Sequence, residues 1–372
     1  MGSLRIWLVL FLVSSMVVVT ACGKGGGDEE ESGVQGGKLE IGAALSLTGS
    51  LAKEGALTKQ GYQLCQDKVN QRGGVKVGDK QLKLAITYSD DKSEPDTAAR
   101  LIDKFNDDGV KLILGPYGSP STEAAAAAVE RNGQVMVDSS GADDNIFTKG
   151  YKTTFAVLSP ATDYVAIIVE AIMSSANPKP KTVAMLSADD GFSQTAAKGG
   201  VAAAKKAGLE VVAQESFPEH TTDVSSALTK IRGKNPDLIL GSVHVEEGIA
   251  IVKQSAELNV KPMGFGETVA PPTPDFKQRF GQDAEYHSAE GAAACLALVL
   301  AVEDAGSTDA AKVRDSLASL DTESFFGPIK FDDTGKNVTK PMSAIQIQDG
   351  KVTTIYPKDQ AEAELQWPGT GG

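Results

Sequence analysis

The chain has 372 residues and a formal net charge of -13 at pH 7, with three histidines and three cysteines. The acidic balance argues against nucleic acid as a partner, because a phosphate backbone selects basic surfaces. Isolated histidines without a Cys-x-x-Cys pair provide no metal-ligand spacing, so we expect neither a metal nor a cofactor.

The first 22 residues carry one arginine, an apolar core from Ile6 to Val13, a second apolar run to Val19 and small residues before Cys22. This pattern predicts a secretory signal and is too short and one-sided for a membrane span. The last four residues, VTAC, resemble the lipobox of bacterial lipoproteins, which implies that Cys22 becomes the lipid-modified first residue of the mature chain. An ordinary signal peptide with a chance cysteine is the alternative. Residues 23–37 are rich in glycine and acidic side chains and predict a flexible tether.

Short apolar segments then alternate with helical ones. The first expected strands are KLEIGAALS, QLKLAITYSD, VKLILG and QVMVDSSG, with helices over about 56–70 and 95–106 and after Ser119. Beyond the extended stretch YKTTFAVLSP the rhythm restarts, with helices expected over 162–174, 192–207, 222–232 and 246–258 and strands in KTVAMLSADD, LEVVAQESF, DLILGS and KPMGFGE. This alternation predicts an α/β fold, and the break near Phe155 to Pro160 predicts two parallel sheets.

Two cysteines remain after Cys22. Cys65 and Cys295 each lie in an apolar helical pattern, so we expect buried free thiols, with a disulfide between them as the alternative.

In open parallel sheets, ligands bind beyond the carboxyl ends of the strands. In the stretch GPYGSPSTEAAAAAVERNG, we expect Ser119 to N-cap a helix, Pro120 to take its first position and Asn132-Gly133 to end it. The free N–H groups of such a helix start, with the nearby Ser and Thr hydroxyls, suit a carboxylate. A serine that merely caps its own helix is the alternative.

Several stretches together carry a family resemblance: IGAALSLTGSLAKEGALTKQGYQLCQDKVNQRGGV, LILGPYGSPSTEAAAAAVERNGQVMVDSSGADDNIF, LSADDGFSQTAAKGG, DLILGSVHVEEGIAIVKQSAELNV and GPIKFDDTGKNV. In order and spacing they resemble the substrate-binding proteins of bacterial branched-chain amino-acid ABC transporters, over nearly all of the chain after the tether. The resemblance implies a type I periplasmic-binding fold, in which two doubly wound, Rossmann-like α/β lobes are joined by three crossovers and close on a ligand.

We place the crossovers at YKTTFAVLSP, at residues 285–290 before the helix GAAACLALVLAVEDAG, and at TKPMSAIQIQ. The expected domain organisation is a lipoprotein signal peptide (1–22), a tether (23–37), an N-terminal lobe (38–156 and 289–340) and a C-terminal lobe (157–288 and 341–366).

The resemblance also implies ligand-binding residues. In the first lobe, Ser119 matches the serine that binds the ligand's α-carboxylate, and Ser140, Gly141 and Ala142 lie in the next strand-to-helix turn. Ala142 stands where the family commonly has threonine, and Tyr117 joins this set. Glu54 stands where the family often has an aromatic ring; a carboxylate there would select a polar or cationic group, with a solvated rim residue as the alternative.

In the second lobe, Phe192 matches an aromatic residue that closes over the ligand, and His244 falls where the family often has an aromatic residue. Glu267 matches the carboxylate that takes the ligand's ammonium group. The alternative for Glu267 is an exposed loop residue before two prolines.

The implied function is that of an extracytoplasmic solute-binding lipoprotein, anchored to the bacterial cell membrane through Cys22 in the periplasm or at the cell surface. It would capture a small zwitterion, an amino acid of branched-chain or related type, and as a monomer deliver it to ABC permease subunits. A receptor module that senses amides or small carboxylates is the alternative; the lipid anchor and the lack of a following transmembrane helix favour transport. We do not expect an enzyme, because the sequence has no G-x-S-x-G elbow, no Ser-His-Asp spacing and no phosphate loop.

Overall fold

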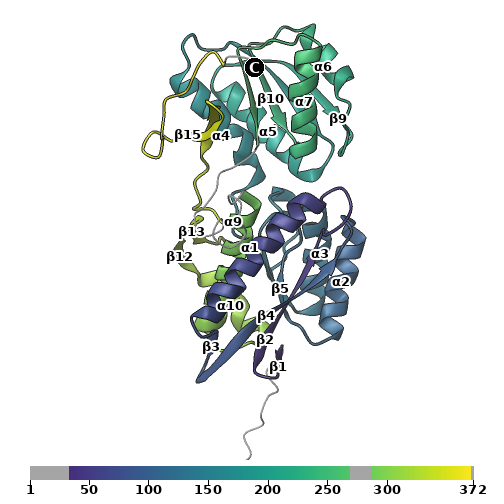
Figure 1. The fold of residues 1–372 in the computed structure, drawn as a ribbon, viewed down its shortest axis with the longest axis vertical. Helices are drawn as coiled ribbons and strands as arrows, with labels where there is room; N and C mark the ends of the chain where they lie inside the picture. The colour runs from purple at the N-terminus through teal and green to yellow at the C-terminus, as the bar shows by residue number, and fades with distance from the viewer. Residues whose placement is uncertain (1–32, 269–285, 370–372) are drawn as a thin grey trace, which may run out of the picture. The chain divides into compact units, whose positions relative to one another are not determined.

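The structure is a computed structural model, and it describes residues 33–268 and 286–369 (Figure 1). The signal segment, Cys22 and the tether up to residue 32 lie outside the described residues.

The first sheet has the strand order β3-β4-β2-β5-β6-β7, with β1 paired to the edge of β2. Its strands are β1 (Val34–Gln35), β2 (Lys38–Leu45), β3 (Val75–Val77), β4 (Lys80–Asp90), β5 (Leu112–Leu114), β6 (Val135–Asp138) and β7 (Thr154–Ala156). The pairings from β4 to β7 are parallel, while β1 and β3 pair antiparallel to their neighbours.

Helices cover both faces of this sheet. They are α1 (Ala52–Gln71), α2 (Pro95–Asp107), α3 (Ser119–Asn132), α9 (Tyr286–Ala305) and α10 (Ala310–Ser319). Since side chains alternate along a strand, Ile41 of β2 packs with α1, α9 and α10, whereas Ile113 of β5 packs with α2 and α3. Strands buried on both faces explain why β5 and β6 read as unbroken apolar runs.

The second sheet is fully parallel, in the order β11-β10-β8-β9. Its strands are β8 (Thr182–Ala188), β9 (Glu210–Phe217), β10 (Leu238–Ser242) and β11 (Gly264–Glu267). Its helices are α4 (Ala161–Ser175), α5 (Gly191–Lys206), α6 (Ser225–Arg232) and α7 (Val245–Glu257). Helices α4 and α5 pack on one face with Met185 and Leu240. Helices α6 and α7 pack on the other face with Leu186 and Ile239.

The expectation of two parallel α/β sheets is confirmed, and most element bounds agree within a few residues. Several details differ. Gly118 is the N-cap of α3 and Ser119 its first helical residue, while Gly133 ends the helix in the left-handed region as expected. Residues 154–156 of the first crossover form β7, and residues 286–290 already belong to α9.

Several elements were not predicted from the sequence. They are β1, β3, α10, the hairpin β12 (Asp321–Ser324) with β13 (Gly327–Lys330), and the hairpin β14 (Ala344–Gln348) with β15 (Lys351–Tyr356). A short 3-10 helix, η1 (Asp144–Thr148), follows β6. In the part of the chain that the structure describes, no single helix has the length and apolar composition to cross a membrane, although the bent pair α9 and α10 meets these criteria jointly.

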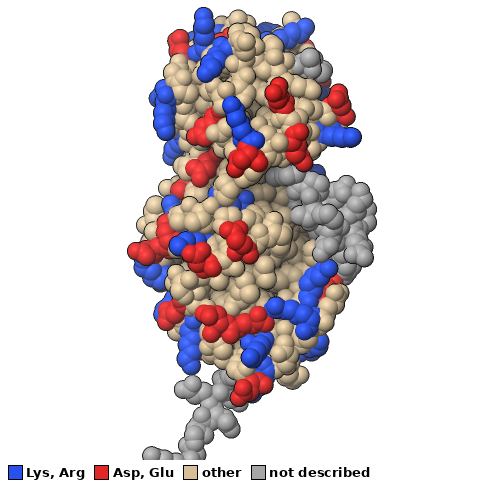
Figure 2. All heavy atoms as spheres, turned by 90° about the vertical axis from the view of Figure 1, so that its left-hand side faces the viewer, with Lys and Arg blue, Asp and Glu red and all other residues tan. Residues whose placement is uncertain are grey.

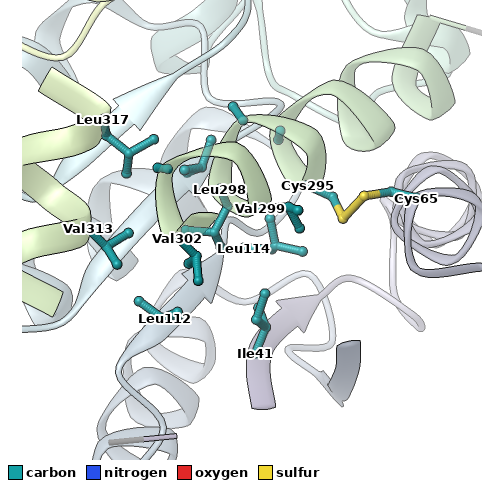
Figure 3. Close-up of a cluster of buried hydrophobic side chains, with 14 of the residues drawn as sticks. Ile41, Cys65, Leu112, Leu114, Cys295, Leu298, Val299, Val302, Val313 and Leu317 are labelled. Carbon is teal, nitrogen blue, oxygen red and sulfur yellow. A yellow bond between two sulfur atoms is a disulfide. The ribbon is translucent and has the colours of Figure 1, made fainter. Parts of the chain in front are cut away.

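The expectation of free thiols is wrong, because Cys65 of α1 and Cys295 of α9 form a disulfide across 230 residues of sequence (Figure 3). The two helices approach closely where both have glycine. A Cβ on Gly61 would lie 2.2 Å from the Ser288 carbonyl oxygen, and one on Gly291 would lie 2.8 Å from the Thr58 carbonyl oxygen. Glycine at both positions allows the helices to pack at disulfide-bonding distance.

We predict that the disulfide contributes about 2–4 kcal/mol to the free energy of unfolding, because it closes a long loop in the unfolded chain. The double substitution Cys65→Ser with Cys295→Ser should lower this free energy by that amount in urea titrations. Dithiothreitol should destabilise the wild type to a similar extent and leave the double variant unchanged. Equal stability of the two proteins without reductant would contradict the prediction.

Candidate functional site

A cavity of about 740 Å³ lies where the strand-to-helix turns of both sheets meet. The turns after β5 and β6 line it on the first-sheet side, and those after β8, β10 and β11 line it on the second-sheet side. The start of α9, helix α4 and residues 340–347 complete the wall. This placement agrees with the rule that open parallel sheets bind ligands at the carboxyl ends of their strands.

The structure brings seven of the nine residues expected to bind ligand into the wall of this cavity: Tyr117, Ser119, Ser140, Ala142, Phe192, His244 and Glu267. The other two, Glu54 and Gly141, do not line it. Glu54 is buried, with 4% of its surface exposed, in the first turn of α1. The solvated-rim alternative for this residue is therefore wrong.

Gly141 shapes the turn after β6. Its N–H donates to both carboxylate oxygens of Asp138, at 3.0 Å each. A Cβ at this position would lie 2.5 Å from the Thr122 side chain. Gly141 therefore lets the turn pack against α3, and the buried Asp138, whose pKa burial raises to about 7, holds the turn in place.

Ser119 is 3% exposed at the start of α3, and its hydroxyl does not cap its own helix. Instead, Oγ accepts a hydrogen bond of 3.1 Å from the backbone N–H of Asp143, in the turn after β6. The hydroxyl hydrogen is therefore free to donate to an anionic group. This donor, beside the helix N-terminus, suits a carboxylate.

Ser140 has the opposite polarity. Its hydroxyl donates to Glu290 Oε1 over 2.8 Å and lies 3.1 Å from the Ser139 hydroxyl, so a remaining lone pair is what it offers a ligand. Glu290 Oε1 also lies 3.0 Å from Nδ1 of His287. The ring of His287 meets that of Tyr117 edge-on, with centroids 5.0 Å apart.

His244 forms an ion pair with Asp190, the two side chains lying 3.5 Å apart. Burial alone would lower the pKa of His244, but the hydrogen-bonding and charge of Asp190 raise it overall. Burial alone would raise the pKa of Asp190, but the hydrogen bond and charge of His244 help to lower it overall. Asp190 also caps α5 by accepting from the N–H of Ser193. The raised pKa favours the imidazolium form of His244, which lies beside Phe192 with the ring centroids 5.6 Å apart.

Glu267 ends β11 and faces the cavity. Its carboxylate packs against two backbone segments, because a Cβ on Gly248 would lie 2.7 Å from Oε2 and one on Gly241 would lie 3.2 Å from Cγ. Oε1 is buried and has no hydrogen-bond partner among the described residues. Burial raises the pKa of Glu267 to about 8. Glu267 is thus a buried acceptor, and the exposed-loop alternative is wrong.

Sequence reasoning missed several polar or aromatic residues of the wall, among them Tyr164, Tyr286, His287, Glu290 and Lys340. The hydroxyls of Tyr164 and Tyr286 lie 2.5 Å apart, and the ring of Tyr164 meets that of Phe192 edge-on. One signal could have revealed Glu290, since it is an acidic residue near the start of the apolar helix α9.

On the face in Figure 2, Lys and Arg side chains are intermingled with Asp and Glu.

Comparisons with known proteins agree with this geometry. The periplasmic binding protein family model matches residues 38–272 and 273–351. Leu/Ile/Val-binding protein homolog 7 of Brucella melitensis is 24% identical, over 89% of this chain and 94% of the relative. Homolog 8 of Brucella abortus is also 24% identical, over 88% and 93%.

Solved structures share the fold. LivJ, the branched-chain amino acid transporter substrate binding protein of Streptococcus pneumoniae in complex with isoleucine, superposes with a TM-score of 0.73 at 22% identity, covering 89% of this chain and 100% of LivJ. A solute binding protein of R. palustris in complex with benzoate superposes with a TM-score of 0.74 at 16% identity, covering 88% and 100%. With two α/β sheets, a cavity at their strand ends and a family match over most of its length, this chain belongs to the periplasmic binding protein family.

Proposed function

We propose that this protein is an extracytoplasmic, lipid-anchored solute-binding protein that captures a small zwitterion, an amino acid of branched-chain or related type, and delivers it to an ABC permease. The family match and the Leu/Ile/Val-binding relatives support this class of ligand. The similarity of the fold to that of LivJ, whose structure contains isoleucine, supports the same class of ligand.

One observation carries the proposal. Among the described residues, the Ser119 hydroxyl accepts a hydrogen bond but has no acceptor of its own at the start of α3, and on the other side of the cavity the buried Oε1 of Glu267 has no partner. The first suits the α-carboxylate of an amino acid and the second suits its ammonium group. The two residues follow strands of different sheets, so one zwitterion would contact both lobes.

The benzoate complex of a structural neighbour raises a second candidate, a small carboxylate without an amino group. The aromatic rings of Tyr164, Phe192 and Tyr286 would suit such a ligand. Glu267 favours the amino acid, because benzoate offers no donor to its buried oxygen.

Capture between two closing lobes would use the organisation proposed from the sequence, with residues 38–156 and 289–340 in one lobe and 157–288 and 341–366 in the other. Contacts between these segments support it. Thr195 Oγ1 of α5 donates to Asp143 Oδ1 over 2.7 Å, and Ser50 Oγ lies 3.2 Å from Nε2 of His220. Ligand contacts on both sides would add to these and favour the closed arrangement.

Replacing the acceptor should weaken binding more than replacing the hydroxyl. Glu267→Gln should weaken the binding free energy by about 2–5 kcal/mol, which is the range for truncating one partner of a buried charge pair. Ser119→Ala should cost about 1–3 kcal/mol, because backbone donors of α3 remain. Calorimetric titration with leucine, isoleucine and valine measures both. Glu246→Gln, on the exposed face of α7, is the control and should bind as the wild type. If Glu267→Gln binds these amino acids undiminished, the ammonium assignment fails.

Binding should also depend on pH. Because burial raises the pKa of Glu267 to about 8, this carboxyl is mostly protonated in the free protein at pH 7 and must lose its proton to hold an ammonium group. Affinity should therefore fall by up to about tenfold for each pH unit below 8, until the carboxyl of the complex titrates. At pH 7, calorimetry in two buffers of different ionisation enthalpy should show proton release. Glu267→Gln should show none, and identical heats for the wild type in both buffers would refute this linkage.

The lipid anchor is tested separately. Cys22→Ala should move the protein from the detergent phase to the aqueous phase in Triton X-114 partitioning, because the acyl chains that give stable membrane attachment would be lost. Cys65→Ser, which leaves the lipobox intact, is the control and should still partition with detergent. Equal partitioning of Cys22→Ala and wild type would exclude lipidation at this residue.

A further inference from the structure

Glu290 lines the cavity although it is almost completely buried, with 1% of its surface exposed. Its Oε1 has two neighbours, the hydroxyl of Ser140 and the imidazole of His287. Its Oε2 is also buried and has no hydrogen-bond partner among residues 33–268 and 286–369. Leaving such an acceptor unsatisfied costs free energy, so it is a ready position for a donor from the ligand.

A donor stands in the same wall. Lys340 lines the cavity, and its ammonium lies 4.1 Å from the centroid of the Phe326 ring and 5.9 Å from that of Tyr286. Burial lowers the pKa of Lys340 to about 8, while the charge of Glu290 acts to raise it. Tyr286 and Glu290 are four residues apart on α9 and therefore share a face of that helix, so the Lys340 ammonium beside the Tyr286 ring lies on the side of α9 that carries Glu290.

Glu290 and Lys340 belong to other elements than the residues proposed to bind the α-carboxylate and the ammonium group of the ligand. Glu290 belongs to α9 and Lys340 to the segment after β13, whereas Ser119 and Glu267 lie at strand ends of the two sheets. A ligand held by its α-groups at Ser119 and Glu267 therefore has a second polar region available to its side chain.

We propose that Glu290 and Lys340 form a side-chain subsite for a carboxamide group, whose N–H donates to Glu290 Oε2 and whose carbonyl oxygen accepts from the Lys340 ammonium. This subsite rests on the proposed function, since it presumes an amino acid bound by its α-groups. A carboxamide is neutral and carries a donor and an acceptor together.

The alternative side chains fit less well. A hydrocarbon side chain would leave Glu290 Oε2 without a partner. A side-chain carboxylate would be repelled by Glu290, and a side-chain ammonium by Lys340. The subsite would thus select asparagine or glutamine over leucine, glutamate and lysine.

Calorimetric titration of the wild-type protein tests this selection with L-glutamine, L-asparagine, L-leucine, L-methionine, L-glutamate and L-lysine as probes. At least one amide should bind about 100-fold more tightly than methionine, which matches glutamine in length but lacks the hydrogen-bonding group. Sites built to hydrogen-bond a ligand group reject analogues that lack it by such factors or more.

Two variants locate the effect. Glu290→Met and Lys340→Met should each reduce the ratio of amide to methionine affinity at least tenfold. Glu246→Gln is the matched control and should keep the wild-type ratio. If Glu290→Met melts far below the wild type, Lys340→Met still provides the test, since its side chain is only partly buried.

The outcomes separate the two proposals. Binding of leucine or methionine as tight as that of both amides, with a ratio unchanged by Lys340→Met, would overturn the subsite and leave the amino-acid function standing. Tighter binding of glutamate or lysine than of the amides would also overturn it. If none of the six amino acids binds, the proposed function itself fails.

Discussion

The contact between α1 and α9 is the one on which the arrangement of the rest depends. After passing through the second sheet, the chain returns to the first, and α9 packs on α1 through paired glycines and the Cys65–Cys295 disulfide. Because the two helices touch backbone to backbone, larger residues at Gly61 or Gly291 would push them apart. This contact ties distant parts of the sequence into one hydrophobic core and carries the first turn of α9 to the cavity.

The cavity derives its chemistry from hydrogen bonds that are only partly satisfied. Ser119 and Ser140 are both serines in strand-to-helix turns, yet Ser119 accepts from a backbone N–H and Ser140 donates to a carboxylate. The first can therefore donate to a ligand and the second can accept from it. Residue type alone does not distinguish these roles, because each role depends on the hydrogen-bond partner of the serine.

Buried carboxylate oxygens without hydrogen-bond partners are costly in a folded protein, and among the described residues this cavity has two of them in Glu267 Oε1 and Glu290 Oε2. Such oxygens are tolerable when a ligand completes their hydrogen bonds. In the Asp190–His244 pair, by contrast, each side chain stabilises the ionised form of the other. The cavity thus combines an ion pair with acceptors that remain open to a ligand.

The sequence by itself determined the alternation of strands and helices, the two parallel sheets and the strand-to-helix turns where a ligand is expected, because these follow from local periodicity and from turn chemistry. The seven expected residues that line the cavity were identified through the family resemblance. It did not determine the cysteine pairing, the hydrogen-bond direction at Ser119 or the presence of Glu290 in the wall. The placement of Glu54 outside the wall was equally inaccessible. Each of these depends on how helices far apart in sequence pack together, and the side chains that meet across such contacts leave no periodic signal in the chain. Only the tertiary structure could decide them.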